Sequence, residues 1–260
     1  THVKASANKR KFDKKMVRKE TRAYEEKLQE ELNIDREKNG KKPFPKEKFE
    51  KEEFKEIKES TTDPESGYYV KDERTKQFAY SFHAATDERG FVLGTIVTPG
   101  NIHDSHILQP LVEKVIEKVK KPLAVAADAA YKTPAITNFL LENQMLPVLP
   151  YTRPKTKDGF FRKHDYVYDE HNDCYICPND QMLPYVTTTK EGYRQFKSNP
   201  TICANCPFLQ QCTESKNHTK LIQRHIWEAY VEEAEHLRHH EEIKLIYAKR
   251  KETIERVFAD

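Results

Sequence analysis

The stretch Leu123-Ala-Val-Ala-Ala-Asp-Ala-Ala-Tyr-Lys132 decides the expected fold. It is a short apolar run, preceded by Pro122, that ends in a single carboxylate, Asp128. An uncharged run of this length is typical of a strand buried on both faces, and Thr133 and Pro134 suit the N-cap and first residue of a helix. Asp128 is therefore expected at the carboxyl end of a strand, where α/β sheets commonly hold ligands and metals. The alternative is that Asp128 only caps the next helix or turn.

The segments on either side of this stretch predict an α/β fold. Residues 78–82 and 91–97 alternate or are rich in β-formers around the turn 87–90, which predicts a hairpin. Apolar residues at helical spacing between 107 and 119 predict a helix, and residues 136–140 and 145–150 read as a further helix and strand. Helix-connected strands beside a hairpin indicate a mixed sheet with helices packed on it.

Composition narrows the class of protein. Of 260 residues, 37% are hydrophobic and 33% are charged, so much of the chain is expected to be solvated helix or extension. The net charge of +3 is too small to indicate a nucleic-acid partner by itself. No stretch approaches the roughly 18 apolar residues that span a bilayer, and no signal peptide is visible. The sequence therefore predicts a soluble, cytoplasmic protein with no membrane partner.

Two charged segments are candidates for contact with DNA. Residues 12–60 are rich in Lys and Glu, with sparse apolar residues mostly four apart, which predicts a charged helical segment. This segment could be a solvated surface without a partner, or it could contact the DNA backbone or a second copy of the chain. A second, basic loop carries aromatic residues among its cations, a combination suited to phosphates and unstacked bases. Its expected DNA-binding residues are Arg153, Lys155, Lys157, Arg162 and Lys163. The alternative is an ordinary basic loop.

All five cysteines fall between positions 174 and 212 and predict a metal site. They form Cys174-x-x-Cys177, Cys203-x-x-Cys206 and a further Cys212. Two C-x-x-C turns can close a tetrahedral zinc site, and disulfides are the less expected use in a cytosolic chain. The expected ligands are Cys177, Cys203, Cys206 and Cys212, or the same set with Cys174 in place of Cys212. Four thiolates leave no open coordination position, so a Zn²⁺ site here is structural; an iron–sulfur cluster is the less favoured alternative.

The last segment, from Ile226 onward, is expected to be one long helix. Ile243, Tyr247, Ile254 and Phe258 mark one side of it, and Glu255 lies beside this stripe. Taken alone, Glu255 is one of many helical glutamates.

Several motifs together give the chain a resemblance to a known family. They are Val-Ala-Ala-Asp-Ala-Ala-Tyr at 125–131, Tyr-Ala-Lys-Arg-Lys-Glu-Thr-Ile-Glu-Arg-Val-Phe at 247–258, the opening residues 1–9, Thr-Asp-Pro-Glu at 62–65 and Gly-Asn-Ile-His-Asp at 100–104. In this combination the chain resembles the DDE transposases of bacterial insertion sequences. It is most similar to the group with a cysteine-bearing insertion before the last acidic helix.

The resemblance implies an RNase H-like fold with two insertions. Residues 1–11 and 61–152 would form the RNase H-like core, and residues 12–60 the charged helical insertion. Residues 153–225 would form the basic, Cys-rich, zinc-knuckle-like insertion, and residues 226–260 the terminal helix of the catalytic core.

Carried over by position, Asp128 corresponds to the second catalytic acid of the family and Glu255 to the third. The first acid would stand immediately ahead of Thr1, and a family lysine would fall beyond Asp260. The sequence therefore resembles a DDE domain clipped at both ends and is expected to be inactive alone. Ala130 stands where the family commonly has glycine. Asp63 is a weaker candidate for a substitute first acid. His103 and Asp104 could be metal ligands, but loop and cap duty is the favoured expectation for both.

The resemblance implies the chemistry of DNA transposition. Two Mg²⁺ (or Mn²⁺) ions about 4 Å apart activate the nucleophile and stabilise the leaving oxygen of a phosphodiester, and hard cations prefer carboxylate oxygens. Asp128 and Glu255 are the expected ligands in Mg²⁺-dependent cleavage of the element ends and strand transfer. The partners are then element and target DNA, with a homodimer expected in the active complex. The alternatives are a zinc-stabilised DNA-binding module with a degenerate catalytic centre, and a metal-dependent nuclease without strand transfer.

Overall fold

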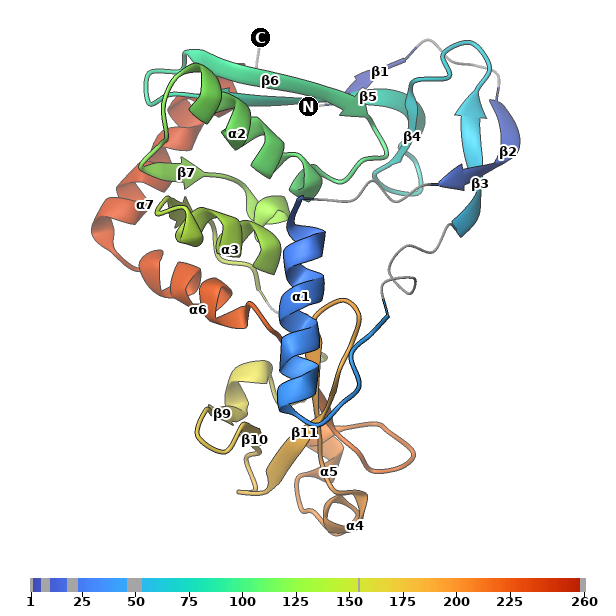
Figure 1. Ribbon diagram of the computed structural model, residues 1–260, viewed down its shortest axis with the longest axis vertical. Helices are drawn as coiled ribbons and strands as arrows, with labels where there is room; N and C mark the ends of the chain where they lie inside the picture. The colour runs from blue at the N-terminus through green and yellow to red at the C-terminus, as the bar shows by residue number, and fades with distance from the viewer. Residues whose placement is uncertain (1, 6–9, 18–22, 46–52, 154, 258–260) are drawn as a thin grey trace. The chain divides into compact units, whose positions relative to one another are not determined.

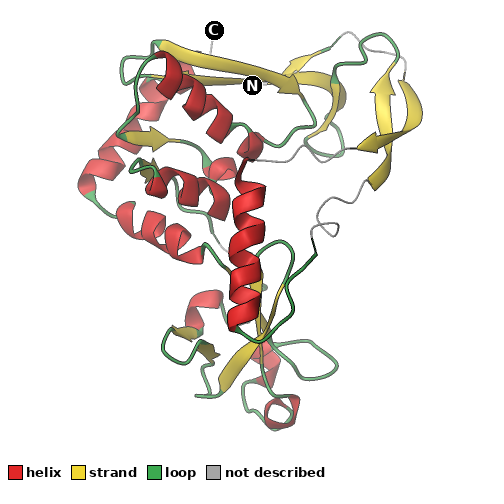
Figure 2. Ribbon diagram, viewed as in Figure 1, coloured by secondary structure: helices red, strands yellow, loops and turns green. Residues whose placement is uncertain are grey.

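The computed structural model describes residues 2–5, 10–17, 23–45, 53–153 and 155–257, and the chain divides into two compact units (Figure 1). Unit 1 comprises Thr1–Glu20, Lys51–Tyr151 and Ala229–Asp260. Unit 2 comprises Thr21–Glu50 and Thr152–Glu228. Both units contain helices and strands, so the predicted mixed α/β architecture is confirmed (Figure 2). In the described part of the chain, no helix is both long and apolar enough to cross a membrane.

The main sheet of unit 1 is antiparallel and is built around β5. Strand β5 pairs with all three others, in a sheet that consists of β1 (His2–Lys4), β4 (Gly67–Val70), β5 (Lys76–Thr86) and β6 (Val92–Pro99). Phe82 lies opposite Val97, which confirms the predicted hairpin. Its turn is closed by Asp87, whose Oδ1 accepts hydrogen bonds from the backbone N–H groups of Arg89 and Phe91, both at 2.9 Å. This is the local bonding that makes aspartate a turn residue.

A strand–helix–strand segment follows the hairpin and carries the core of unit 1. It consists of η2 (Asp104–His106), α2 (Leu108–Lys118), β7 (Ala124–Ala126), η3 (Ala129–Tyr131), α3 (Pro134–Glu142) and β8 (Leu146–Val148). Helix α2 packs on β5 and β6 (Figure 1). Its apolar side joins α3 in a buried cluster of Leu108, Val112, Ala127, Ile136, Leu140, Met145 and Leu149. Thr133 caps α3 and Pro134 begins it, as predicted.

The single mixed sheet that we expected is divided in two. Strands β7 and β8 pair in parallel, with Val125 opposite Pro147, and among the described residues neither bonds to the four-stranded sheet. Both strands have only three residues, so few backbone groups are available to extend the pairing. The predicted order of strands and helices is correct, and the predicted continuity of the sheet is not.

Of the described residues in the segment predicted to be helical, 12–17, 23–45 and 53–60, those that form a helix lie in the middle. Residues at its two ends form β2 (Arg10–Val17) and β3 (Glu53–Ser60), which pair antiparallel in unit 1. Helix α1 (Ala23–Lys38) lies between them in sequence and belongs to unit 2. The error has a physical cause: a spacing of four residues returns to the same face of a strand as well as of a helix.

The long terminal helix predicted from Ile226 is also corrected. The segment forms α6 (Glu228–Leu237), α7 (Glu241–Ala248), η5 (Lys249–Glu252) and α8 (Ile254–Val257). The first break lies at His240, which has extended backbone angles and is the N-cap residue of α7, and the second lies at Thr253. No proline or glycine marks either break in the sequence, so the pattern of apolar residues did not reveal them.

Unit 2 is an antiparallel meander with short helices at one end. The five strands follow the order β13-β12-β11-β10-β9, and they are β9 (Val167–Asp169), β10 (Cys174–Ile176), β11 (Met182–Thr188), β12 (Tyr193–Lys197) and β13 (Leu221–His225). The helical turns are η4 (Lys163–Asp165), α4 (Pro200–Cys203) and α5 (Leu209–Cys212). A mostly aromatic core fills the unit, with Tyr166, Tyr175, Leu183, Phe196 and Ile222 buried.

Charged and polar side chains fix helix α1 to this meander. Asp35 Oδ1 lies 3.1 Å from Arg194 Nε, and Arg194 also pairs with Asp173 at the turn before β10. One turn earlier on α1, Glu31 Oε2 accepts a hydrogen bond from the indole Nε1 of Trp227 at 2.5 Å. Trp227 is 1% exposed, so the helix is anchored through a buried aromatic residue as well as through ion pairs.

His225 predicts a pH-dependent stability for unit 2. The side chain is 5% exposed, and its Nδ1 accepts a hydrogen bond from the N–H of Trp227 at 3.1 Å. Burial lowers the pKa of His225 to about 4. The unfolded chain binds a proton near the ordinary pKa of 6.5, and the folded chain does not bind it until about pH 4. Stability is therefore expected to fall as pH drops through this window, by about 3 kcal/mol in all.

This expectation is checked by urea unfolding at pH 7 and pH 5. Trp227 is the single tryptophan, so its fluorescence follows unit 2. His225→Gln should flatten the pH dependence, whereas the exposed His218→Gln should leave it unchanged. Equal pH dependence in the parent and His225→Gln would contradict the assignment.

Candidate functional site

Asp128 lies immediately beyond the end of β7, as the sequence predicted, and it also caps a turn. Its Oδ1 accepts a hydrogen bond from the N–H of Ala130 at 2.9 Å and so forms the N-cap of η3. The two sequence-based alternatives are therefore compatible: one carboxylate oxygen orders the turn, and Oδ2 makes no hydrogen bond with the described residues. Ala130 does not have left-handed backbone angles, so it needs no glycine.

A half-buried tyrosine and a buried histidine hold the turn after Asp128. Tyr131 ends η3, and its hydroxyl lies 3.4 Å from Nδ1 of His83, a residue of β5 that is 5% exposed. Nε2 of His83 lies 3.2 Å from Thr98 Oγ1 on β6. Lys132 pairs with Glu235 on α6. These contacts tie the Asp128 turn to the hairpin and to the terminal helices, and the sequence analysis did not identify either His83 or Tyr131.

The surroundings of Tyr131 are acidic. Burial raises its pKa above the ordinary value, and the nearby charges of Asp104 and Asp128 raise it further. Asp104 belongs to η2, which packs against η3. His103 caps η2, because its Nδ1 accepts from the N–H of Ser105 at 3.2 Å. The cap duty expected for His103 is thus confirmed, and Asp104 lies within electrostatic reach of the turn after Asp128.

Close backbone packing places the loop that leads to η2. A Cβ added to Gly67 would lie 2.6 Å from the backbone nitrogen of Gly100, and one added to Gly100 would lie 2.8 Å from the carbonyl oxygen of Ala79. Side chains are therefore excluded at both positions. The glycine that opens the Gly100–Asp104 motif therefore lies close against the backbone of Gly67 and Ala79.

Glu255 lies in the same compact unit as Asp128. It is exposed on α8, and α8 packs against β5, the strand that carries His83. Among the described residues, no three Cys, His, Asp or Glu side chains converge in an arrangement that could hold a metal ion. The joint binding of divalent ions by Asp128 and Glu255 therefore stays a prediction.

Asp63 has a structural role at a turn. Its Oδ1 accepts a hydrogen bond from the hydroxyl of Tyr80 at 2.7 Å, which raises the pKa of Tyr80 to about 12. Its backbone N–H donates to Ser60 Oγ, and its carbonyl accepts from Ser66 Oγ. These contacts account for Asp63 without a catalytic role.

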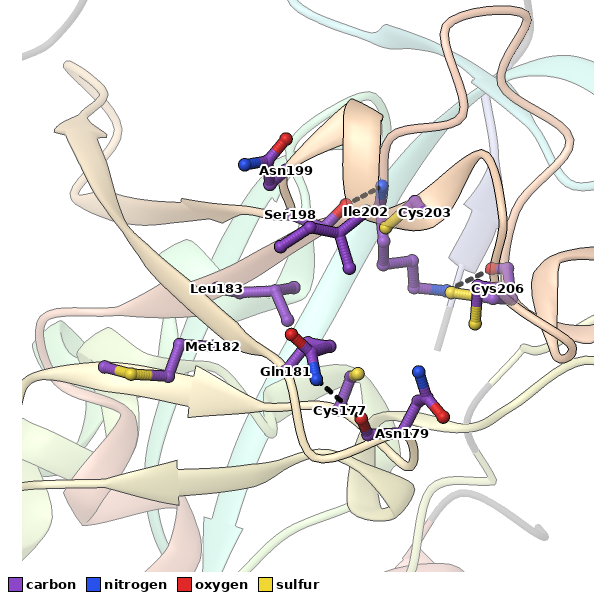
Figure 3. Close-up of a pocket in the computed structure, with 12 residues that line it drawn as sticks. Cys177, Asn179, Gln181, Met182, Leu183, Ser198, Asn199, Ile202, Cys203 and Cys206 are labelled. Carbon is purple, nitrogen blue, oxygen red and sulfur yellow. Dashed lines mark hydrogen bonds between the residues drawn. The ribbon is translucent and has the colours of Figure 1, made fainter.

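Four of the five cysteines line one small cavity of unit 2. The cavity has a volume of about 30 Å³, and its thiols are those of Cys177, Cys203, Cys206 and Cys212. Figure 3 shows Cys177 on the turn that also carries Asn179, whereas Cys203 and Cys206 come from another segment. The N–H of Cys206 donates to the carbonyl of Cys203 at 3.1 Å, which closes the C-x-x-C turn. All five cysteines are free of disulfides.

Cys174 is separate from this group. It is 1% exposed within β10, opposite Asp169 and Pro184, and it does not line the cavity. Of the two ligand sets left open by the sequence, the one with Cys212 is therefore the one that shares a cavity.

The basic loop is partly neutralised within unit 2. Lys157 pairs with Glu214 and Lys163 pairs with Glu228. The three other predicted DNA-binding residues, Arg153, Lys155 and Arg162, are exposed, and among the described residues they form no ion pair. The cations that remain available to a phosphate backbone are these three.

Comparison with known proteins bears on the last third of the chain. Residues 176–260 match the model of a family described as a transposase DDE domain. This match supports a DDE transposase, and the mixed α/β structure is compatible with an RNase H-like transposase domain. The matched region contains Glu255 and four of the cysteines, and it begins after Asp128 and Cys174. No curated protein and no solved structure matches the chain.

Proposed function

We propose that this chain is the catalytic domain of a DDE-type transposase that cuts the ends of an insertion sequence and joins them to target DNA. The observation that carries the proposal is the position of Asp128 at the end of β7, in the same compact unit as Glu255 on α8. The family match over residues 176–260 supports it independently.

Asp128 and Glu255 carry the type of donor atom that Mg²⁺ requires. Oδ2 of Asp128 and the exposed carboxylate of Glu255 are oxygen donors of the kind that hard cations prefer. Divalent ions at this site would activate the attacking oxygen and stabilise the leaving one. Asp128 and Glu255 would hold these ions, and the contacts of Tyr131 and Lys132 keep the Asp128 turn in place.

Two successive displacements at phosphorus follow from this assignment. In the first, water attacks a phosphodiester at the end of the element, and the bond to the 3′-oxygen breaks to leave a 3′-hydroxyl. In the second, this 3′-hydroxyl attacks a phosphodiester of the target and releases a 3′-hydroxyl on the target strand. The active complex is a homodimer in this proposal, since two ends must be joined to one target.

The cysteine cavity is proposed as a structural Zn²⁺ site. Its four thiols are the soft donors that zinc prefers, and they occupy one cavity. As they stand, the four thiols do not converge in a metal-holding arrangement. Binding therefore requires them to reorient, and rotation about the Cα–Cβ bond is one motion available to them. Four thiolates leave no open position for substrate, so the site stabilises unit 2 and does not take part in the reaction.

The basic loop predicts a graded effect on DNA affinity. Lys155→Ala and Arg162→Ala each remove an exposed cation without an ion pair, so each should lower the slope of log K against log salt by about 1. Lys157→Ala should change this slope less, because Glu214 already neutralises Lys157. Fluorescence anisotropy with a labelled duplex over a series of salt concentrations measures the slope. Equal slopes for Lys155→Ala and the parent would show that the basic loop does not contact DNA.

A DNA-binding module with a degenerate catalytic centre is the second candidate. The cysteine cavity and the exposed cations Arg153, Lys155 and Arg162 of the basic loop are the observations that favour it. The test uses the full-length protein, with DNA fragments from both flanks of its own coding sequence as substrate. Mg²⁺-dependent cleavage that EDTA abolishes, followed by joining to a second duplex, supports the transposase. Cleavage without joining indicates a nuclease, and binding without cleavage indicates the module.

A further inference from the structure

One wall of the cysteine cavity carries a cation and a hydroxyl. Lys220 lines the cavity, and its Nζ donates to the carbonyl oxygen of Cys212 at 2.9 Å. Tyr166, which is 4% exposed, places its hydroxyl 3.2 Å from Cys212 Sγ. The Lys220 ammonium also lies 5.2 Å from the centre of the Tyr166 ring. The two side chains thus meet the same cysteine, one at its backbone and one at its sulfur.

The cation of this wall is held in position by the backbone. The N–H of Lys220 donates to Ser198 Oγ at 2.8 Å, and the carbonyl of Lys220 accepts from the N–H of Ser198 at 3.0 Å. Lys220 directly precedes β13, and Cys212 ends α5. Lys220 is therefore held both at its backbone, by Ser198, and at its ammonium group, by the carbonyl of Cys212.

The negative charge of a four-thiolate zinc site would be stabilised by a cation and an O–H donor in the wall of the cavity. Four thiolates outweigh one divalent ion, so a Zn²⁺ site of this kind is an anion in a partly buried place. Among the residues that line the cavity, Lys220 carries the one positive charge. A cation and an O–H donor beside the sulfurs offset that negative charge and orient the ligand.

We propose that Lys220 and Tyr166 form the outer shell of a zinc site whose ligands are Cys177, Cys203, Cys206 and Cys212. Lys220 compensates the charge and fixes the backbone of Cys212, and Tyr166 donates a hydrogen bond to its sulfur. Cys174 takes no part. The inference rests on the proposed use of the cavity as a zinc site, and it adds the residues that set the affinity for the metal.

The test measures zinc directly on the whole chain. Zinc content is determined by elemental analysis, and affinity by competition with a chromogenic chelator. Lys220→Met is expected to lower the zinc affinity about 10- to 100-fold, and Tyr166→Phe about tenfold. Lys220→Arg keeps the charge and should restore most of the affinity. Lys216→Met, an exposed lysine of the same loop, is the matched control and should leave the affinity unchanged.

The outcomes separate this inference from the zinc site itself. A parent chain that binds no zinc overturns both. If Lys220→Met and Tyr166→Phe bind zinc as tightly as the parent does, the outer-shell assignment is wrong, although the zinc site itself stands. Loss of zinc in Cys174→Ser with retention in Cys212→Ser overturns the ligand set. Native Trp227 fluorescence in each variant shows that unit 2 is folded, and Tyr166→Phe keeps the test valid if Lys220→Met fails to fold.

Discussion

In the full-length protein, Asp128→Asn is expected to abolish Mg²⁺-dependent cleavage of element-end DNA, with a loss of at least about a thousandfold. The substitution removes the negative charge and preserves the shape of the side chain. The amide oxygen can still accept the hydrogen bond from Ala130, so η3 should stay capped. The loss would therefore arise from the metal ligand and not from the fold.

Glu255→Gln should produce a loss of the same order. Its matched control is Glu252→Gln, three residues earlier, which removes an exposed carboxylate from the same terminal segment. The rate of cleavage of a labelled duplex at saturating Mg²⁺ measures each effect. Cleavage by Asp128→Asn at the rate of the parent would refute the assignment. An equal loss in Glu252→Gln would show that the terminal segment acts through its overall charge.

Arg194→Met is expected to destabilise unit 2 by about 3 to 5 kcal/mol. Arg194 is 14% exposed and lies between Asp35 on α1 and Asp173 at the turn before β10. Its removal leaves two partly buried carboxylates without their cation, and it removes one of the contacts that hold α1 on the meander. Removing one partner of a buried ion pair is costly because the other charge stays buried without compensation. Replacing both partners by apolar residues often costs no stability.

Urea unfolding followed by Trp227 fluorescence measures this cost at pH 7. Adding Asp35→Asn to Arg194→Met should recover part of the stability, because it removes one uncompensated charge. Lys190→Met is the control, since the exposed Lys190–Glu191 pair, at 3.9 Å, should contribute less than about 1 kcal/mol. A loss below 1 kcal/mol in Arg194→Met would show that the network does not anchor α1.

The sequence was most informative where local rules coincide. The run that ends in Asp128, with Thr133 and Pro134 behind it, correctly predicted a strand, a turn and a helix start, because an apolar run and a cap are local features. The hairpin of β5 and β6 was predictable for the same reason. The ends of the segment 12–60 were not, because a four-residue spacing fits both helix and strand.

By itself, the sequence determined the order of strands and helices around Asp128, the chemical type of the donors at the cysteines, and the presence of Glu255 near the end of the chain. Those features depend on residue identity and on neighbours within a few positions. Only the tertiary structure decided that Cys212, and not Cys174, shares the cavity, that His83 reaches Tyr131, and that the terminal segment breaks at His240. Each of these depends on packing between residues far apart in sequence, which no local pattern encodes.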